Sequence, residues 1–217
     1  MTVTNAASNL RDALRSGANI GELQLAALAY LNTDPASAYW HPYGFVKLPL
    51  TADPSQRISL HVWHPRIRRL QTPPHICHSH GWLLESTVLA GTLVDVRYTT
   101  IPSATGEACL YAVSYEGDTS VARKTMRRFA VEFKDRIVCQ AGTCYQIPAD
   151  DFHTTELPTN IAVTAVHNVN DPAQAGCTIR SLSDADMIRY QRGLPSEDDR
   201  RILIADAFRA IATALEP

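Results

Sequence analysis

Two histidines, His78 and His80, stand two residues apart at the start of a largely apolar run. Residues i and i+2 of a β-strand point to the same face, so the two imidazoles are expected to lie side by side. Two neutral imidazoles on one face form half of a site for a first-row transition metal. A third histidine on a later strand would complete the site, and His153 is the candidate. The chemistry that these residues predict is metal binding.

The composition limits the classes of protein to which the chain can belong. It has 217 residues, of which 45% are hydrophobic and 19% charged, so a sizeable core can form. The net charge of −2 gives no general attraction to nucleic acid or to an anionic membrane, and neither is expected as a partner. No apolar run is long enough to span a bilayer, and the N-terminus lacks the apolar stretch of a secretory signal. We therefore expect a cytoplasmic protein.

The cysteines favour free thiols. Their number is odd and no CxxC pair occurs, which argues against a disulfide framework and against a zinc ribbon. The five residues are Cys77, Cys109, Cys139, Cys144 and Cys177. We expect thiols in a reducing compartment, most of them acting as small buried apolar residues.

The elements that must position the histidines form a β-rich core between two helical segments. The three parts are 1–39, 40–180 and 181–217, and together they are expected to form one domain. In the first part, leucines recur at helical spacing, and Gly17 and Gly21 predict a division into two helices.

The C-terminal part is expected to hold two further helices. Ser183 with Asp186 resembles a capping box, which would start the first of them. The acidic stretch after Ser196, followed by apolar residues at helical spacing, would start the second.

The core between these segments is rich in Val, Ile, Thr and Tyr and is interrupted at short intervals by Pro, Gly and Asp. Many short strands separated by turns are typical of a β-sandwich or a β-barrel. The candidate strands are 44–50, 57–63, 83–98, 108–115, 120–127, 129–133, 135–139, 142–147 and 161–168. All eight histidines lie in this core, so the functional site is expected there.

Two motifs in the core resemble those of the cupin family. The histidine pair, an apolar strand and Gly91 resemble the first cupin motif, while Gly142, a turn at Pro148 and His153 resemble the second. In that family the two motifs lie close together in a closed barrel, which implies that His153 faces the histidine pair. The resemblance implies a mainly β fold, a cupin-type β-barrel or jelly roll, to which the N-terminal and C-terminal helices are added.

The order of motifs within 40–180 is similar to that of the cysteine dioxygenase group, the thiol dioxygenases. The matching stretches are Leu-His-Val-Trp at 60–63, His-Ser-His at 78–80, Leu-Ala-Gly-Thr-Leu at 89–93, Gly-Thr-Cys-Tyr at 142–145, His153 with Glu156, and Val-Thr-Ala-Val-His at 163–167. The resemblance implies Fe(II) held by His78, His80 and His153. It also implies that His167 faces the pocket beside the metal ligands without itself binding the metal.

Several positions depart from that group. Its members have a tyrosine two residues after the final histidine, where this chain has Val169. The cysteine that crosslinks to this tyrosine in some members falls at about Glu85. Many cupins use a glutamate here as a fourth ligand, but strand alternation turns Glu85 away from the histidine pair unless a bulge near Gly81 shifts the register. The arginine that binds the substrate carboxylate has no clear match, although Lys47 and Arg57 are candidates. The substrate is therefore not expected to be cysteine itself.

Other residues of the core have structural interpretations beside functional ones. His41, His61, His64 and His75 are expected to be structural or to lie at the surface. Trp82 shares the parity of the histidine pair and is expected to shape the cavity.

The predicted function is that of a metal-dependent oxygenase, in which Fe(II) and O2 oxidise a small thiol-derived or amino-acid-derived molecule, for example in a biosynthetic pathway. Three neutral ligands leave coordination positions open for substrate and O2. Catalytic roles are expected for His167, Tyr145 and Lys47. Two alternatives stay open, namely a lyase or isomerase that uses the metal as a Lewis acid, and a non-catalytic ligand-binding cupin. A homodimer is expected by analogy with the family.

Overall fold

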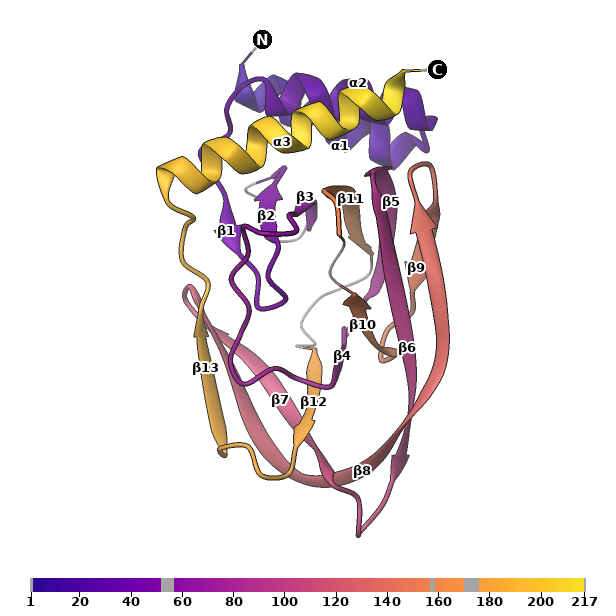
Figure 1. Cartoon of the computed structure of the whole chain (residues 1–217), viewed down its shortest axis with the longest axis vertical. Helices are drawn as coiled ribbons and strands as arrows, with labels where there is room; N and C mark the ends of the chain where they lie inside the picture. Colours follow the sequence, from indigo (N-terminus) through magenta and orange to yellow (C-terminus); the bar gives the residue numbers. More distant parts are fainter. Residues whose placement is uncertain (1, 52–56, 157–158, 170–175, 217) are drawn as a thin grey trace.

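The computed structural model describes residues 2–51, 57–156, 159–169 and 176–216 (Figure 1). Within these ranges the chain forms three helices and thirteen strands, and the strands pair in two antiparallel sheets. The two sheets face each other around an interior cavity, which is the arrangement of a cupin-type barrel. The predicted mainly β architecture with helices near both ends of the chain is confirmed.

The first sheet has six strands in the order β1-β2-β3-β11-β5-β9. Their bounds are β1 (Tyr39–Trp40), β2 (Val46–Pro49), β3 (Ile58–Trp63), β11 (Ala162–Val169), β5 (Leu83–Ala90) and β9 (Cys144–Ile147). β11, from late in the chain, lies between β3 and β5 and pairs with both. The second half of the core therefore completes a sheet that the first half begins.

The second sheet has seven strands in the order β13-β8-β6-β10-β4-β12-β7. Their bounds are β13 (Met187–Gln191), β8 (Thr119–Gln140), β6 (Thr92–Pro102), β10 (Phe152–Glu156), β4 (Cys77–Ser79), β12 (Cys177–Ser181) and β7 (Ala108–Glu116). β8 is long enough to pair with β7 and β13 through its first half and with β6 through its second. Because β7 also pairs with β8, the ring of pairings closes.

Three helices lie together at one end of the molecule, over the outer face of the first sheet (Figure 1). They are α1 (Val3–Ser16), α2 (Ile20–Leu31) and α3 (Glu197–Leu215). Gly17, at φ 69°, ends α1, and Asn19 with Glu22 forms a capping box at the start of α2. The helix expected after Ser196 is observed as α3, and the side chain of Ser196 caps it.

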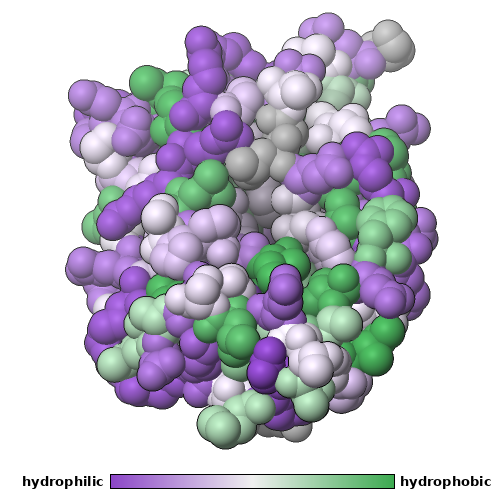
Figure 2. Space-filling view, turned by 60° about the horizontal axis from the view of Figure 1, so that its bottom comes forward, coloured by the Kyte–Doolittle hydropathy of each residue, from purple (hydrophilic) through white to green (hydrophobic). Residues whose placement is uncertain are grey.

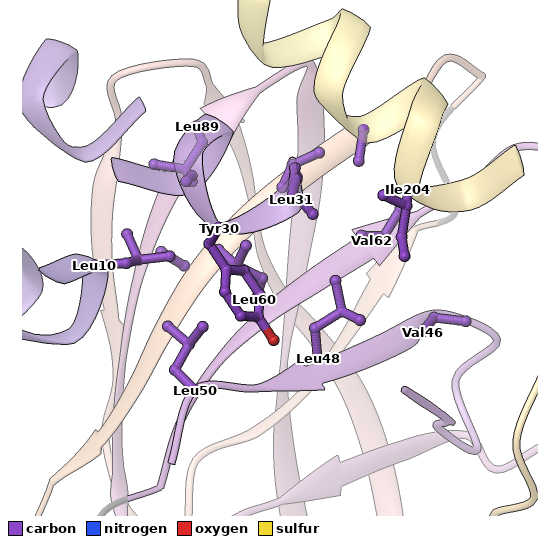
Figure 3. Packing of buried hydrophobic residues seen from close by; sticks show 14 of the residues in the cluster. Leu10, Tyr30, Leu31, Val46, Leu48, Leu50, Leu60, Val62, Leu89 and Ile204 are labelled. Carbon is purple, nitrogen blue, oxygen red and sulfur yellow. The ribbon is translucent and has the colours of Figure 1, made fainter. Parts of the chain in front are cut away.

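The main hydrophobic core lies between these helices and the first sheet (Figure 3). Every residue of β3 is buried, because one face of this strand packs on the helices and the other faces the interior of the barrel. Leu60 and Val62 point toward the helices, where they meet Leu31 and Ile204 (Figure 3). Alternation along the strand therefore sends His61 and Trp63 toward the interior.

Four predicted elements differ from the observed ones. The strand expected over 83–98 is divided at Gly91 into β5 and β6, which belong to different sheets. No helix begins at Ser183: residues 182–186 form turns that lead into β13, and Lys124 Nζ donates hydrogen bonds of 2.8 Å to the carbonyl oxygens of Leu182 and Asp184 there. The three strands expected within 120–139 are one continuous strand, β8. The run that starts at His78 is not one strand either, because β4 belongs to the second sheet and β5 to the first.

Gly91 makes the turn between β5 and β6 possible. It has φ 74°, and a Cβ atom there would lie 2.1 Å from the carbonyl oxygen of Ile161. Only glycine avoids this contact, so Gly91 is required for the chain to reverse between the two sheets.

No helix of the described residues is long and apolar enough to cross a bilayer. Some large apolar side chains are exposed on β8, including Met126 at 97% and Phe133 at 65%. Figure 2, which brings the end opposite the helices forward, shows hydrophobic residues in small groups among hydrophilic ones. The homodimer expected from the sequence stays a prediction.

Candidate metal centre

The fold brings His78, His80 and His153 together. Their potential ligand atoms all lie within 4.8 Å of one another. The Nε2 atoms of His80 and His153 are 3.2 Å apart, and the ring centroids of His78 and His153 are separated by 4.2 Å. Three imidazoles that converge in this way form a donor set for one metal ion.

Strand pairing explains this convergence. β10 pairs with β4 so that His153 lies directly opposite His78, and residues directly opposite in an antiparallel pair share a face. His80 follows immediately after β4, where its carbonyl oxygen accepts a hydrogen bond of 2.8 Å from the backbone N–H of Asp150. The chain then crosses to the first sheet, and Trp82 still faces the interior as expected.

The environment of His78 and His80 favours their neutral form. Burial and the neighbouring imidazoles hold the pKa of His78 and the pKa of His80 well below the usual value of 6.5. His78 is 6% exposed, and its Nδ1 atom is buried without a hydrogen-bond partner among the described residues. A neutral imidazole offers a lone pair to a metal without first losing a proton.

A buried aspartate orients the third histidine. Asp95 Oδ1 lies 2.7 Å from His153 Nδ1, so the other ring nitrogen, Nε2, faces the cluster. Arg97 is paired with the same carboxylate and also contacts Asp151. Burial raises the pKa of Asp95, but hydrogen bonds from His153 and Arg97 more than offset this and leave the pKa below its ordinary value. A carboxylate behind a ligand histidine fixes its tautomer and raises its basicity as a ligand.

The sequence interpretation missed Asp95, although a signal was present. Aspartate is depleted in strands, and this one stands between Val94 and Val96 in a β-rich stretch. An isolated carboxylate on the inner face of a barrel strand needs a partner, and His153 is that partner.

The histidine cluster lies at the meeting point of two adjoining cavities. The smaller, of about 80 Å³, is lined by all three histidines, and the larger, of about 410 Å³, extends from His78 and His80. Both sheets contribute to the walls. Pockets that bind small molecules commonly have volumes of about 300–1,000 Å³. The larger cavity therefore has room for a small molecule beside the histidine cluster.

Aromatic rings pack against the histidines. The ring of Tyr43 stacks on that of His78 with centroids 4.0 Å apart, and the ring of Trp82 lies 5.2 Å from that of His80. The indole Nε1 of Trp82 and Oδ1 of Asn168 are buried without partners among the described residues, and both residues line the cavities. The walls therefore offer polar groups that a ligand could satisfy.

Two histidines expected to be structural or superficial also line the interior. His41 borders both cavities and His61 borders the smaller. Burial and neighbouring positive groups hold the pKa of each well below 6.5. The ring of Phe45 stacks between them, with centroids 4.2 Å from His41 and 4.4 Å from His61. The other two fit the expectation better: His64 is buried against Asp206 of α3, and His75 contacts Tyr43.

Lys47 and Tyr145 lie where the sequence placed them. Lys47, on β2, lines both cavities, and burial lowers the pKa of its amine to about 8, with repulsion from Arg57 and Arg192 adding to the effect. Tyr145, on β9, lines the smaller cavity, and burial raises the pKa of its hydroxyl to about 12. At neutral pH the first is a cation and the second is a hydrogen-bond donor.

His167 and Glu85 do not face the cavities. On β11 the inward residues are Thr164, Val166 and Asn168, so alternation turns His167 to the other side of the sheet. There its Nδ1 lies 3.5 Å from Glu85 Oε2. The expected position of His167 behind the ligands is therefore not observed. Glu85 is turned away by the alternation that the sequence indicated, and it does not belong to the histidine cluster.

The cysteines agree with the sequence interpretation. All five are free, and three of them, Cys77, Cys109 and Cys139, are buried. None of them joins the histidine cluster found among the described residues. The donor set is therefore nitrogen only, which suits first-row metals such as iron, zinc, copper and nickel.

Comparison with known proteins finds similarity to solved structures but none to family models or curated sequences. No family model matches the sequence, and neither does any curated protein. Hydroquinone 1,2-dioxygenase PnpCD, solved in complex with Cd2+ and 4-hydroxybenzonitrile, is 14% identical over 69% of this chain and 76% of its own, with a TM-score of 0.36. A structure of the DMSP lyases RdDddP and RnDddQII is 13% identical over 85% of this chain and 77% of its own, also with a TM-score of 0.36.

A third solved structure is a cupin-like protein from Thermotoga maritima. It is 11% identical over 77% of this chain and 89% of its own, with a TM-score of 0.30. The site of the present chain is therefore interpreted from its own residues.

Proposed function

We propose that the chain is a metal-dependent oxygenase of the cupin type, which holds Fe(II) through His78, His80 and His153 and uses O2 to oxidise a small molecule. The observation that supports this most directly is the convergence of three imidazoles beside a cavity of about 410 Å³. When bound, the metal supplies open coordination positions at which an anionic donor atom of the substrate and O2 can meet.

The residues around the cluster have separable tasks in this proposal. Asp95 holds His153 in the tautomer that turns Nε2 to the metal. Tyr43 and Trp82 cover the ligand rings and limit the access of water. Tyr145 keeps its phenol proton and can donate a hydrogen bond to a bound ligand.

We propose that the chain shares only its three histidine ligands with the cysteine dioxygenase group. Val169 stands where that group has a tyrosine, and Glu85 stands where some members have the crosslinking cysteine. His167, which the resemblance implied as a pocket residue, lies on the opposite face of β11. We therefore propose a substrate other than cysteine, handled in a reducing cytoplasmic environment.

Metal analysis and oxygen consumption test the proposal. Anaerobically reconstituted protein is expected to bind one Fe(II) per chain, and His78→Ala or His153→Ala is expected to weaken binding by more than the roughly 100-fold that loss of an outer partner can cost. Cys144→Ser is the control, because this exposed thiol is the other type of ligand that could hold iron adventitiously. Unchanged iron content in both histidine variants would contradict the proposal.

The oxygen requirement separates the proposal from its alternatives. Turnover of a candidate substrate that stops under strict anaerobiosis and resumes with O2 supports an oxygenase. Turnover that continues without O2 would overturn it in favour of a lyase or isomerase. Ligand binding that is equally tight with and without metal, and that leads to no product, would point to a non-catalytic binding protein.

A further inference from the structure

We propose that the end of the larger cavity at Lys47 and Arg192 binds an oxyanion, so that the substrate is a small molecule carrying a carboxylate or phosphate group. The inference rests on the proposed function, because the histidine cluster is taken to hold the reacting end of the same molecule. Four observations support it: the charge of the cavity walls, the environment of Lys47, the environment of Arg192, and the position of Lys47 between Arg192 and the histidine cluster.

Among the described residues, the walls of the larger cavity carry positive charge and no negative charge. Lys47, Arg57 and Arg192 line it, and none of the described residues that line it is an aspartate or a glutamate. The chain as a whole has a net charge of −2, so this concentration of cations is local and not a consequence of composition. A cavity lined by one sign of charge attracts ligands of the opposite sign.

Lys47 is a partly buried cation without an acidic partner among the described residues. It projects from β2 between Val46 and Leu48, which face the helices. Lys47 lines the same cavity as Arg57 and Arg192, whose positive charges lower the pKa of its amine further. Removing a charge from water without a counter-charge is costly, and an anion bound here would offset that cost.

Arg192 is held in place without being neutralised. Its Nε and Nη2 donate hydrogen bonds of 3.2 and 2.7 Å to the backbone carbonyl oxygens of Asp118 and Gly117. The carboxylate of Asp118 is engaged elsewhere, since it accepts hydrogen bonds from Thr119 and Gln191. The guanidinium is therefore oriented by carbonyl groups and keeps its full charge for a ligand.

Aromatic rings flank Arg192 and define its orientation further. Its guanidinium lies 4.9 Å from the centroid of Tyr115 and 5.9 Å from that of Tyr39, and both tyrosines line the cavity. The backbone carbonyl groups engage Nε and Nη2, whereas Nη1 donates no hydrogen bond to the described residues and can donate to a carboxylate or phosphate oxygen.

The position of Lys47 connects the cation-lined end to the histidine cluster. Lys47 lines the larger cavity with Arg192 and the smaller cavity with all three histidines. A molecule that fits about 410 Å³ can therefore place an oxyanion between Lys47 and Arg192 while another of its atoms reaches the cluster. Arg57, stacked over Trp82 at 5.1 Å, adds a third positive charge along this path.

Titration of the full-length protein with simple probes tests the inference. Propionate and inorganic phosphate are the two anionic probes, and propionamide is the neutral match for propionate. Binding is measured by calorimetry at pH 7 and constant ionic strength, in metal-free and in Fe(II)-loaded protein under anaerobic conditions. One of the anions is expected to bind at least about 10-fold more tightly than propionamide, as charge-assisted hydrogen bonds imply, and the one that does identifies the oxyanion.

The variants locate the binding site. Lys47→Gln and Arg192→Gln are each expected to weaken binding of the preferred anion by about 10-fold or more, and Lys47→Arg to retain most of it because the charge is kept. Arg189→Gln is the matched control: Arg189 lies on β13 close to Arg192 in sequence but pairs with Glu116 outside the cavity. Circular dichroism confirms that each variant is folded, and Lys47→Arg keeps the test decisive if Lys47→Gln does not fold.

The outcomes for the anion site and for the metal centre are distinguishable. Binding of both propionate and phosphate that is no tighter than that of propionamide, or anion affinities of the Lys47 and Arg192 variants equal to that of Arg189→Gln, would overturn the anion site even if iron binds normally. Anion binding that depends on both cations in a protein that binds no iron would overturn the proposed oxygenase and leave the anion site standing.

Discussion

The two faces of the first sheet have opposite characters. On β3 the outward residues Leu60 and Val62 join an apolar core with the helices, while the inward residues include His61. On β2, Val46 and Leu48 face the helices and Lys47 faces the cavity. The side of the first sheet that faces the helices thus carries apolar side chains, and the side that faces the cavity carries titratable ones.

The difference teaches that stability and chemistry are assigned to separate faces. On the outer face the buried amide of Gln24 is satisfied, because its Nε2 donates a hydrogen bond of 2.8 Å to the carbonyl oxygen of Leu89. The inner side leaves polar atoms such as His78 Nδ1 and Trp82 Nε1 buried without partners among the described residues. Unsatisfied buried groups cost stability, and they are retained where a ligand can use them.

Truncating the outer face should produce the largest loss of stability. Leu60→Ala removes a fully buried side chain between β3 and the helices and should lower the free energy of unfolding by about 2–5 kcal/mol. Iron bound per folded chain should stay the same, because Leu60 does not line the cavity. Urea denaturation measures the first quantity and metal analysis the second, with Leu25→Ala, at a 60% exposed position of α2, as the control. A loss of iron affinity without a loss of stability would erase the separation between the faces.

Disturbing the orientation of His153 should have the next largest effect. Asp95→Asn keeps the size of the side chain but removes the carboxylate behind Nδ1, and it should weaken iron binding by about 10–100-fold, or about 1.4–2.7 kcal/mol. Competition with a metal chelator measures the affinity. Asp151→Asn is the matched control, because Asp151 also contacts Arg97 but is far more exposed. Equal effects of the two substitutions would mean that Asp95 acts only through Arg97.

The sequence was sufficient to predict residues whose position depends on local alternation. The helices that start after Asn19 and Ser196 carry their own capping residues. The inward direction of Trp82 and the outward direction of Glu85 follow from period two. The convergence of His153 on the histidine pair came from the family resemblance, since a pairing across the barrel leaves no trace in local pattern.

Features that depend on distant pairing could not be predicted in the same way. The segment at Ser183 has the composition of a helix start, but Lys124 on β8 holds its carbonyl groups and the chain continues as β13. Arg192 follows that strand, so its arrival at the cavity could not be anticipated. The inward position of His61 was missed because β3 is buried on both faces and shows no contrast between polar and apolar sides.

Acid should destabilise the inner face before the outer one. The pKa of His61 lies well below 6.5 in the folded protein, because of burial and then of Lys47 and His80, so below pH 6.5 the unfolded chain binds more protons. Stability should therefore be unaffected by this group above pH 6.5 and should fall below it, by at most about 1.4 kcal/mol per pH unit. The slope comes from urea denaturation between pH 7.5 and 5.5, and His61→Gln should reduce it. If the slope of unfolding free energy against pH is unchanged in His61→Gln, His61 does not cause the loss of stability in acid.

The smallest effect on stability and iron affinity is expected for substitution of Glu85. This residue faces outward, and its neighbour Ser86 faces the cavity. Glu85 points away from the cavities and contacts Gln146 and His167 near the surface, whereas Ser86 faces inward. Glu85→Gln keeps the size of the side chain, so it should change stability by less than about 0.5 kcal/mol and iron affinity by no more than about twofold. Chelator competition on this variant beside wild type decides whether Glu85 is a fourth ligand. A loss comparable to that of Asp95→Asn would require β5 to shift its register by one residue in the metal-bound protein, because only that shift turns Glu85 inward and Ser86 outward.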